Sequence, residues 1–243
     1  MFKKISNTQS KHIKNLHRKK NRQNFNEFIV EGTKTVLEFL NSEFENVGIF
    51  ADEQWLTDYI NTIDGFELYS VNSKQLQQIS TFKNPQPVLA TFKIPKSTKK
   101  IDENFILFLE DIRDPGNLGT IIRSAEWFGL KQVFCSETCA DVYNTKVIQA
   151  SMGSAARVLV NYIATEDLLK NFPNHKAVLA DMNGIELKKY AWAEKNMLII
   201  GNEANGVSDS LRNTIGNKIT IPRKGNAESL NASISAAIIL SHI

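Results

Sequence analysis

The chain has 243 residues, of which 42% are hydrophobic and 23% are charged, and its formal net charge is +3. This length suits two domains, and the composition is that of a soluble globular protein. No apolar run reaches the roughly 20 residues that span a bilayer, and the basic start MFKKISNTQSKH lacks the apolar core of a signal peptide. Two cysteines, Cys135 and Cys139, are too few for a disulfide framework and only weakly suggest zinc. We therefore expect a cytoplasmic protein with no membrane segment and no metal.

The N-terminal segment concentrates positive charge. Within Ser10–Asn24 no acid accompanies the basic side chains, and Ile13 and Leu16 form an apolar edge at helical spacing. Most charge runs are solvated helix faces, but this one also suits contact with phosphate groups. The residues that would make such contacts are Lys11, Lys14, Arg18, Lys19 and Arg22.

From Phe28 onward, strands and helices alternate. We expect strands at Phe28–Glu31, Val47–Phe50, Phe66–Val71 and Val88–Ile94. We expect helices at Thr33–Leu40, Trp55–Ile63 and Ser73–Ile79. This pattern predicts a small α/β domain over residues 1–95, without an evident catalytic constellation. The polar stretch KSTKKIDE, residues 96–103, lacks apolar periodicity and is the predicted linker.

The alternation restarts in the second half, which predicts another α/β domain over residues 104–243. Phe105–Leu109 is a continuous apolar run, typical of a parallel strand that is covered on both faces. Further strands are expected at Gln132–Cys135, Arg157–Val160, Ala177–Ala180, Met197–Ile200 and Ile219–Ile221. Helices are expected at Leu118–Phe128, Val142–Ala150, Glu166–Leu169 and Leu230–Ile243.

The last helix of the chain is unusual because it carries almost no charge. A surface helix normally has Lys and Glu on one face, so this one should be buried on several sides. Ser229 stands where the N-cap is expected, directly after the polar loop Arg223–Glu228. Taken alone, the stretch is equally well explained as a capped core helix.

Two further loops follow strands of the predicted sheet, whose carboxyl ends are where ligands bind in open parallel sheets. In the loop EDIRDPGN and the helix after it, Asn117 lies near the helix start and Arg123 lies farther inside. An arginine there suits an anion, although a surface salt bridge would give the same pattern. In the loop GNEANGVS, Gly201 permits a sharp turn and Glu203 is the only acid, which could simply brace the loop.

Two common nucleotide-binding patterns are absent from the second domain. Its first strand is followed by Asp-Pro-Gly-Asn-Leu-Gly, which does not match the Gly-x-Gly-x-x-Gly fingerprint of dinucleotide-binding folds. The chain also lacks the Gly-x4-Gly-Lys-Ser/Thr loop of nucleotide triphosphatases. A dehydrogenase and a P-loop enzyme are therefore disfavoured.

The three loops together resemble the signature motifs of the SpoU/TrmH-type RNA ribose 2′-O-methyltransferases, members of the SPOUT superfamily. The matching residues are Asn117-Leu118-Gly119 with Arg123 and Ala125, Ile200-Gly201-Asn202-Glu203 with Gly206-Val207, and Ile221-Pro222 with Gly225 and Ser229–Ser233. The resemblance is strong from Phe105 to the end. It is looser in the N-terminal half, where KHIKNLHRK and FIVEG look like a substrate-binding domain of ribosomal-protein L30e type.

The resemblance implies a catalytic domain whose parallel sheet ends in a deep C-terminal trefoil knot. It also implies a homodimer in which the partner's first motif completes the active site. The cofactor would be S-adenosyl-L-methionine, bound in the knot, with Asp181 as another residue that could border the adenosine. By position, the cofactor-binding residues would be Ala180, Gly201, Ile221, Leu230 and Ser233.

The implied reaction is methyl transfer to a ribose 2′-hydroxyl of RNA, with ribosomal RNA favoured over transfer RNA. The catalytic residues would be Asn117, Arg123, Glu203, Ser229 and Asn231. A guanidinium with a pKa above about 12 is a poor base, so Arg123 would position the phosphate beside the target ribose. Asn117 would orient the substrate or Arg123, and Glu203 would fix its loop and could also hold Arg123. A non-catalytic RNA-binding protein and a base methyltransferase stay open as alternatives.

Overall fold

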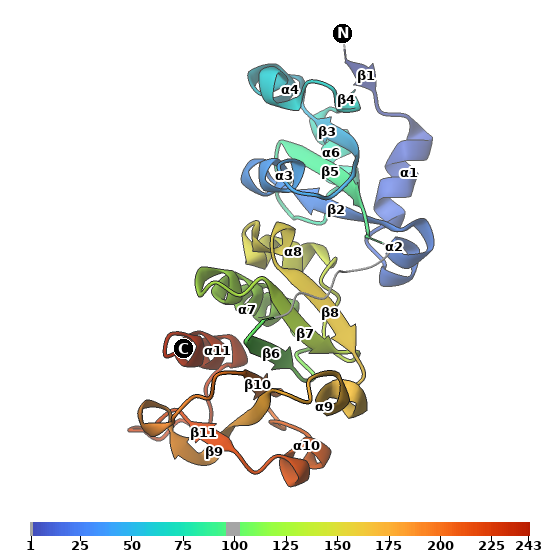
Figure 1. Ribbon diagram of the computed structural model, residues 1–243. Helices are drawn as coiled ribbons and strands as arrows, with labels where there is room; N and C mark the ends of the chain where they lie inside the picture. Colours follow the sequence, from blue (N-terminus) through green and yellow to red (C-terminus); the bar gives the residue numbers. More distant parts are fainter. Residues whose placement is uncertain (1, 96–102) are drawn as a thin grey trace. The chain divides into compact units, whose positions relative to one another are not determined.

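The computed structural model describes residues 2–95 and 103–243, which form two compact units (Figure 1). The first unit comprises Met1–Ser97 and Tyr143–Ala156, and the second comprises Thr98–Val142 and Arg157–Ile243. The units are therefore not continuous along the chain, as the predicted domains are. Residues 96–102 of the predicted linker lie outside the described residues, and the domain boundaries stay a prediction.

The first unit is built on a mixed sheet in the order β1-β4-β3-β5-β2, in which β5 runs antiparallel to β2 and β3. Its strands are β1 (Lys3–Lys4), β2 (Glu27–Glu31), β3 (Asn46–Ala51), β4 (Leu68–Ser70) and β5 (Val88–Lys93). Its helices are α1 (Asn7–Asn15), α2 (Lys19–Phe25), α3 (Thr33–Leu40), α4 (Glu53–Asp58), α5 (Ile60–Ile63), α6 (Ser73–Ile79) and α8 (Thr145–Ser151). The alternation expected from Phe28 onward is confirmed, although the helix predicted at Trp55–Ile63 is divided in two at Tyr59.

The basic segment forms α1 and α2. Ile13 and Leu16 are fully buried, as their helical spacing predicts, and Lys11, Lys14, Arg18 and Lys19 are exposed. Arg22 contradicts its predicted role because it is only 3% exposed. Its Nη1 atom donates to the carbonyl oxygens of Leu16 and His17, both at 3.0 Å. These carbonyls follow α1 and have no partner within that helix, so Arg22 completes the fold rather than contacting a phosphate.

Glu27 joins α1 to the sheet through a buried carboxylate. It accepts hydrogen bonds from His12 Nε2 and Lys93 Nζ, each at 2.7 Å, and it is 7% exposed. Burial alone would raise the pKa of Glu27, but the hydrogen bonds from Lys93 and His12 outweigh burial and lower the pKa below its ordinary 4.5. A carboxyl with a lowered pKa stabilises the fold above the unfolded-state pKa, and this stabilisation is lost as the pH falls through the folded-state pKa.

A Glu27→Gln variant should therefore lose on the order of 1 kcal/mol of stability at pH 7. The difference from the wild type should shrink below pH 4.5, the ordinary pKa of the glutamate side chain. Thermal melts of both proteins across this pH range would measure it. Glu67→Gln is the matched control, since Glu67 pairs with Lys3 at 2.6 Å on the exposed surface. Equal losses in the two variants would contradict the role of burial.

The second unit is a six-stranded sheet in the order β11-β9-β10-β6-β7-β8, and every neighbouring pair is parallel (Figure 1). Its strands are β6 (Phe105–Leu109), β7 (Gln132–Ser136), β8 (Leu159–Ile163), β9 (Lys176–Glu186), β10 (Asn196–Ile200) and β11 (Lys218–Thr220). Its α-helices are α7 (Pro115–Trp127), α9 (Leu168–Asn171), α10 (Asp209–Thr214) and α11 (Ala232–Leu240). The parallel α/β sheet is confirmed. Among the described residues, no helix combines the length and apolarity needed to cross a bilayer.

This unit departs from the prediction at several element boundaries, and one helix was not predicted. Helix α7 begins at Pro115 rather than Leu118, because Asp114 caps it and proline suits the first helical turn. Strand β9 continues to Glu186 instead of ending at Ala180. Its pairing with β11 jumps from Leu179 opposite Lys218 to Ile185 opposite Ile219, so the residues between Leu179 and Ile185 leave the ladder as a bulge. Helix α10 was not predicted.

The last helix packs against α7, as Figure 1 shows. Its N-cap is Asn231, not Ser229, because the Asn231 side chain accepts from the backbone N–H groups of Ser233 and Ile234. Ser229 lies before the cap and is exposed. The expected burial on several sides agrees with the structure, because five of the nine residues of α11 are buried, three are half-buried and only Ile234 is exposed, at 51%.

Candidate active site

Three residues far apart in sequence meet through their side chains. Asn117, in the first turn of α7, donates from Nδ2 to Oε1 of Glu203. Asn231, the N-cap of α11, donates from its Nδ2 to Oδ1 of Asn117 at 2.9 Å. These residues come one from each of the three predicted loops, so the structure brings together three of the five predicted catalytic residues.

Helix caps hold two members of this cluster in place. Asp114 accepts from the backbone N–H of Asn117 at 2.8 Å, which fixes the start of α7. The Oδ1 atom of Asn231 accepts from the N–H of Ser233 at 2.9 Å and from its hydroxyl at 2.6 Å. With Oδ1 occupied at the cap, the Nδ2 group of Asn231 points to Asn117. The cluster is therefore preorganised by the ends of α7 and α11.

The loop Gly201–Ser208 is tied to the end of β6. Asn202 Nδ2 donates to the carbonyl oxygen of Asp111 at 3.0 Å, and Glu110 accepts from the backbone N–H of Ser208 at 2.7 Å. Glu110 is 7% exposed. Glu203 was expected to brace this loop by accepting backbone hydrogen bonds, but it accepts from the side chain of Asn117 instead. Glu110 and Asn202 were not predicted as anchors, although Glu110 is an acid placed directly after a buried strand.

Gly201 and Gly206 make the closest backbone approach in this loop. A Cβ atom on Gly201 would lie 2.2 Å from the carbonyl oxygen of Gly206. Gly201 directly precedes Asn202, which forms an antiparallel bridge with Gly206 and accepts from the Gly206 N–H at 2.8 Å. Only glycine fits at position 201, because any side chain would collide with the Gly206 backbone.

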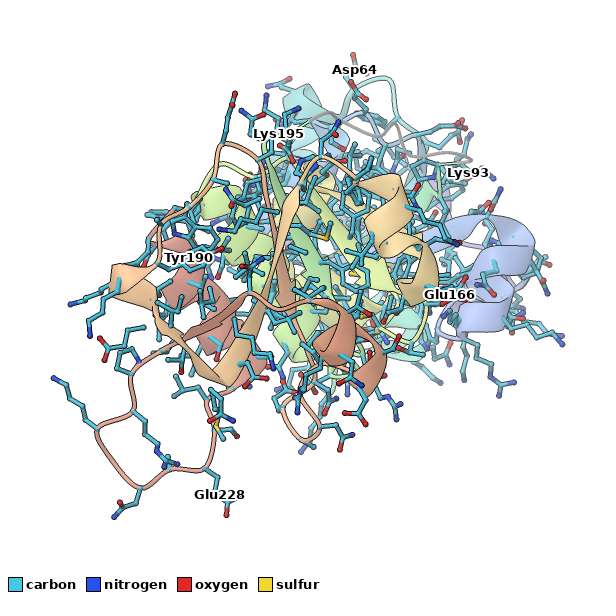
Figure 2. All side chains as sticks on the ribbon, turned by 60° about the horizontal axis from the view of Figure 1, so that its bottom comes forward. Asp64, Lys93, Glu166, Tyr190, Lys195 and Glu228 are labelled. Atoms are coloured by element: carbon cyan, nitrogen blue, oxygen red, sulfur yellow. The ribbon has the colours of Figure 1, made fainter. Side chains whose placement is uncertain are left out.

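The other predicted cofactor residues differ in how far they are exposed. Ala180 and Ile221 are half-buried, and Leu230 is 44% exposed. Ser233 is 7% exposed and gives its hydroxyl to Asn231, so it supports the cap. Figure 2 shows the loop that carries Glu228 extending away from the sheet. Residues 222–230 of this loop are all exposed, so its backbone is accessible.

Arg123 and Ser229 lie outside the cluster. Arg123 is exposed on α7 and makes no hydrogen bond or ion pair with any residue that the structure describes. It follows Asn117 by six residues, which places the two side chains on different faces of the helix. The predicted contacts of Arg123 with Asn117 or Glu203 are therefore not made within one chain. Ser229 likewise makes no hydrogen bond among the described residues.

The two cysteines lie next to the loop EDIRDPGN, which contains Ile112. Cys139 accepts from the backbone N–H of Ile112 at 3.2 Å, and both thiols are buried. The hydrogen bond with Cys135 lowers the pKa of Cys139 to about 7 despite burial. Within residues 2–95 and 103–243, no three His, Cys, Asp or Glu side chains are grouped so that they could hold a metal ion.

The family of this chain follows from its match to a known family model. Residues 104–241 match the model of the SpoU rRNA Methylase family. The chain belongs to this family. Residues 7–90 of this SpoU methylase match a second family, the MRM3-like substrate binding domain.

Individual relatives of the SpoU methylase agree over nearly the whole chain. The 23S rRNA (guanosine(2553)-2′-O)-methyltransferase RlmP of Bacillus subtilis is 31% identical over 98% of this chain and 96% of the relative. A TrmH-family putative RNA methyltransferase from Porphyromonas gingivalis has a TM-score of 0.87 at 30% identity, with 98% and 97% of the chains covered. An AdoMet-bound rRNA methyltransferase from Sinorhizobium meliloti has a TM-score of 0.85 at 26% identity, with 99% and 95% covered.

Proposed function

We propose that this SpoU methylase transfers a methyl group from S-adenosyl-L-methionine to a ribose 2′-hydroxyl of ribosomal RNA. The observation that carries the proposal is the hydrogen-bonded cluster of Asn117, Glu203 and Asn231, one residue from each family motif. One relative that covers nearly the whole chain is named as a 23S rRNA 2′-O-methyltransferase, and one solved neighbour is named as an AdoMet-bound rRNA methyltransferase. A ribosomal substrate fits the cytoplasmic location expected from the sequence.

The residues present suit this cofactor. Gly201 and Gly206 carry no side chain over a half-exposed stretch of backbone, and the loop before α11 is exposed. Gly201, Ile221 and Leu230 would hold the cofactor, with Ala180 at its adenosine end. When bound, the cofactor supplies a methyl group attached to a sulfonium sulfur. The neutral thioether that departs is a good leaving group, so the reaction needs no metal. The protein mainly has to position the two reactants.

Arg123 is the residue that we assign to the RNA. Its planar guanidinium presents paired donors that match a phosphate group, and it stays charged throughout. We infer that Arg123 holds the phosphate beside the target ribose. The 2′-hydroxyl then gives its proton to that phosphate or to a water. Asn117 and Asn231 would orient the ribose, while Glu203 keeps Asn117 in place.

We propose that a second copy of the chain completes the site. Arg123 shares an exposed stripe of α7 with Thr120 and Trp127, and Trp127 is 83% exposed. Ile234 on the neighbouring α11 is 51% exposed. An apolar surface of this kind, with an unpaired arginine in it, suits an isologous dimer. Such a dimer would carry Arg123 into the partner's active site.

We also infer the family's deep trefoil knot in the second unit. Strand β11 is an edge strand next to β9, and the chain then returns to pack α11 against α7. This path, together with the SpoU match over residues 104–241, supports threading of α11 through the preceding loops. For the first unit we propose an L30e-like RNA-binding domain, supported by the match to a substrate binding domain.

The exposed cations of α1 and α2 would contact RNA phosphates. Replacing Lys11, Lys14 or Lys19 with Ala should weaken RNA binding about equally for different sequences. Each change should also lower the slope of log K against log salt by about 0.7–1. Arg22→Ala should instead lower the melting temperature, because Arg22 holds carbonyl groups inside the fold. Filter binding at several salt concentrations, with thermal melts, tests both statements.

The proposed function has a direct test. Purified protein is titrated calorimetrically with S-adenosyl-L-methionine, and unmodified ribosomal RNA treated with both is analysed as nucleosides. A 2′-O-methylated nucleoside supports the proposal. Binding without product would indicate another RNA, such as transfer RNA, which is then assayed in parallel. A methylated base would favour base methylation, and absence of cofactor binding with or without RNA would favour a non-catalytic RNA-binding protein.

A further inference from the structure

An ion pair joins α10 to Asp181, which the resemblance places near the adenosine and which lies outside the cluster of Asn117, Glu203 and Asn231. Arg212 lies on α10, and its Nε atom is 3.5 Å from Oδ2 of Asp181, at the start of the β9 bulge. The Asp181 side chain is 10% exposed, and its other oxygen accepts from the N–H of Asn183 at 2.9 Å. The Nε atom of Arg212 is buried without a hydrogen-bond partner. Asp181 and the Nε atom of Arg212 are therefore shielded from water, whereas the Arg212 side chain as a whole is 38% exposed.

The same guanidinium backs the loop Gly201–Ser208. A Cβ atom on Gly206 would lie 2.9 Å from Nη2 of Arg212, so this nitrogen lies close to the Gly206 backbone. The Gly206 backbone also lies against Gly201, where an added Cβ would be 2.2 Å from the Gly206 carbonyl oxygen. Gly206 therefore lies close both to the Arg212 guanidinium and to Gly201, the predicted cofactor contact.

The bulge that Asp181 begins also packs against β11. A Cβ atom on Gly184 would lie 2.6 Å from the backbone nitrogen of Ile219, so the bulge rests directly on β11. Strand β11 leads into the loop that carries Ile221 and Leu230. The Arg212–Asp181 pair thus links the β9 bulge to the Gly201–Ser208 loop. The same bulge packs on β11, the strand that leads to Ile221 and Leu230.

We propose that Arg212, paired with Asp181, is a positioning residue that sets the affinity for the cofactor by holding the backbone of Gly206 against Gly201. The inference rests on the proposed function, since it concerns the same cofactor site. Arg212 acts through Gly206 and touches no reacting group. The Glu110–Ser208 hydrogen bond holds the start of α10, so the helix presents Arg212 from a fixed base.

The test is a double-mutant cycle on cofactor binding. The Kd for S-adenosyl-L-methionine is measured for the wild type, Arg212→Gln, Asp181→Asn and the double variant. We expect each single change to raise Kd about tenfold and the double variant to raise it no further, because both remove one interaction. At saturating cofactor, kcat should stay within about twofold of the wild type while the KM for the cofactor rises. Arg212→Lys should recover only part of the affinity, because an ammonium lacks the planar fork.

Matched controls separate this role from general stability. Lys170 and Asp167 form an exposed pair at 3.2 Å in the same unit, and Lys170→Gln should leave Kd unchanged. Melting temperatures establish that each variant is folded at the assay temperature. The proposal is overturned if Arg212→Gln binds as the wild type does, or if the two single effects multiply in the double variant. Failure of the wild type to bind would instead count against the proposed function.

Discussion

An Arg123→Ala enzyme should bind S-adenosyl-L-methionine with wild-type affinity and lose its methyl transfer. The side chain makes no contact with the Asn117, Glu203 and Asn231 cluster of its own chain, so the fold and the cofactor loops should not change. Removing the group that holds the substrate phosphate should lower kcat by about 10²–10³ or more. Arg123→Lys should also be severely impaired, since it keeps the charge but not the paired donors. Calorimetry and single-turnover methylation measure the two effects separately, and unchanged turnover in Arg123→Ala would refute the assignment.

Mixed dimers of two variants would then show whether Arg123 acts in the active site of its own chain or in that of the partner. Arg123→Ala and Asn231→Ala subunits are each expected to be inactive as homodimers. If Arg123 serves the partner's site, each mixed dimer has one intact site, and equal mixing should restore roughly a quarter of the wild-type rate. If Arg123 serves its own chain, mixing restores nothing. Co-refolding of the two variants provides the mixed dimers, and Lys170→Gln mixed with Arg123→Ala controls for dilution.

The parallel sheet and the cluster of Asn117, Glu203 and Asn231 were predictable because strong local signals mark both. Continuous apolar runs such as Phe105–Leu109 have few other interpretations, and polar loops at the strand ends must meet at one edge of the sheet. The N-cap of α11 was harder to place. Ser229 and Asn231 are both good capping residues, and only the packing of α11 on α7, with Asn117 beside the cap, selects Asn231.

The other errors of prediction share a cause: the polar residues in these segments give no local sequence signal of the structure that they form. Helix α10 has one buried apolar residue, Leu211, which is too little for a periodic signal. The second half of β9 follows a bulge of turn-forming residues, so its pairing with β11 is a tertiary feature. Arg22 looked like its basic neighbours, and nothing local reveals that it turns inward to the carbonyl groups after α1. Arg212 was missed in the same way, as a charged residue whose partner lies in another segment.

A Gly201→Ala change should abolish cofactor binding, although it adds a single methyl group. The new Cβ atom would lie 2.2 Å from both the carbonyl carbon and oxygen of Gly206 and 2.4 Å from the nitrogen of Val207. These are backbone atoms, held by the Asn202–Gly206 bridge and by the Glu110–Ser208 hydrogen bond, so they cannot turn aside as a side chain would. Overpacking of this kind costs about 1–3 kcal/mol, and the loop must move to relieve it.

Gly216→Ala is the matched control, because a Cβ atom there would meet nothing within 4 Å and Gly216 does not have a positive φ. This variant should keep wild-type cofactor affinity and gain up to about 1 kcal/mol of stability from the stiffer unfolded chain. Calorimetric titration and thermal melts of the two variants then compare one methyl group in a packed backbone with one in open space. Wild-type affinity in Gly201→Ala would place the cofactor away from this loop. Loss of affinity in that variant alone, with the protein still folded, would locate the cofactor against the Gly201–Gly206 backbone, where the Arg212–Asp181 pair is inferred to act.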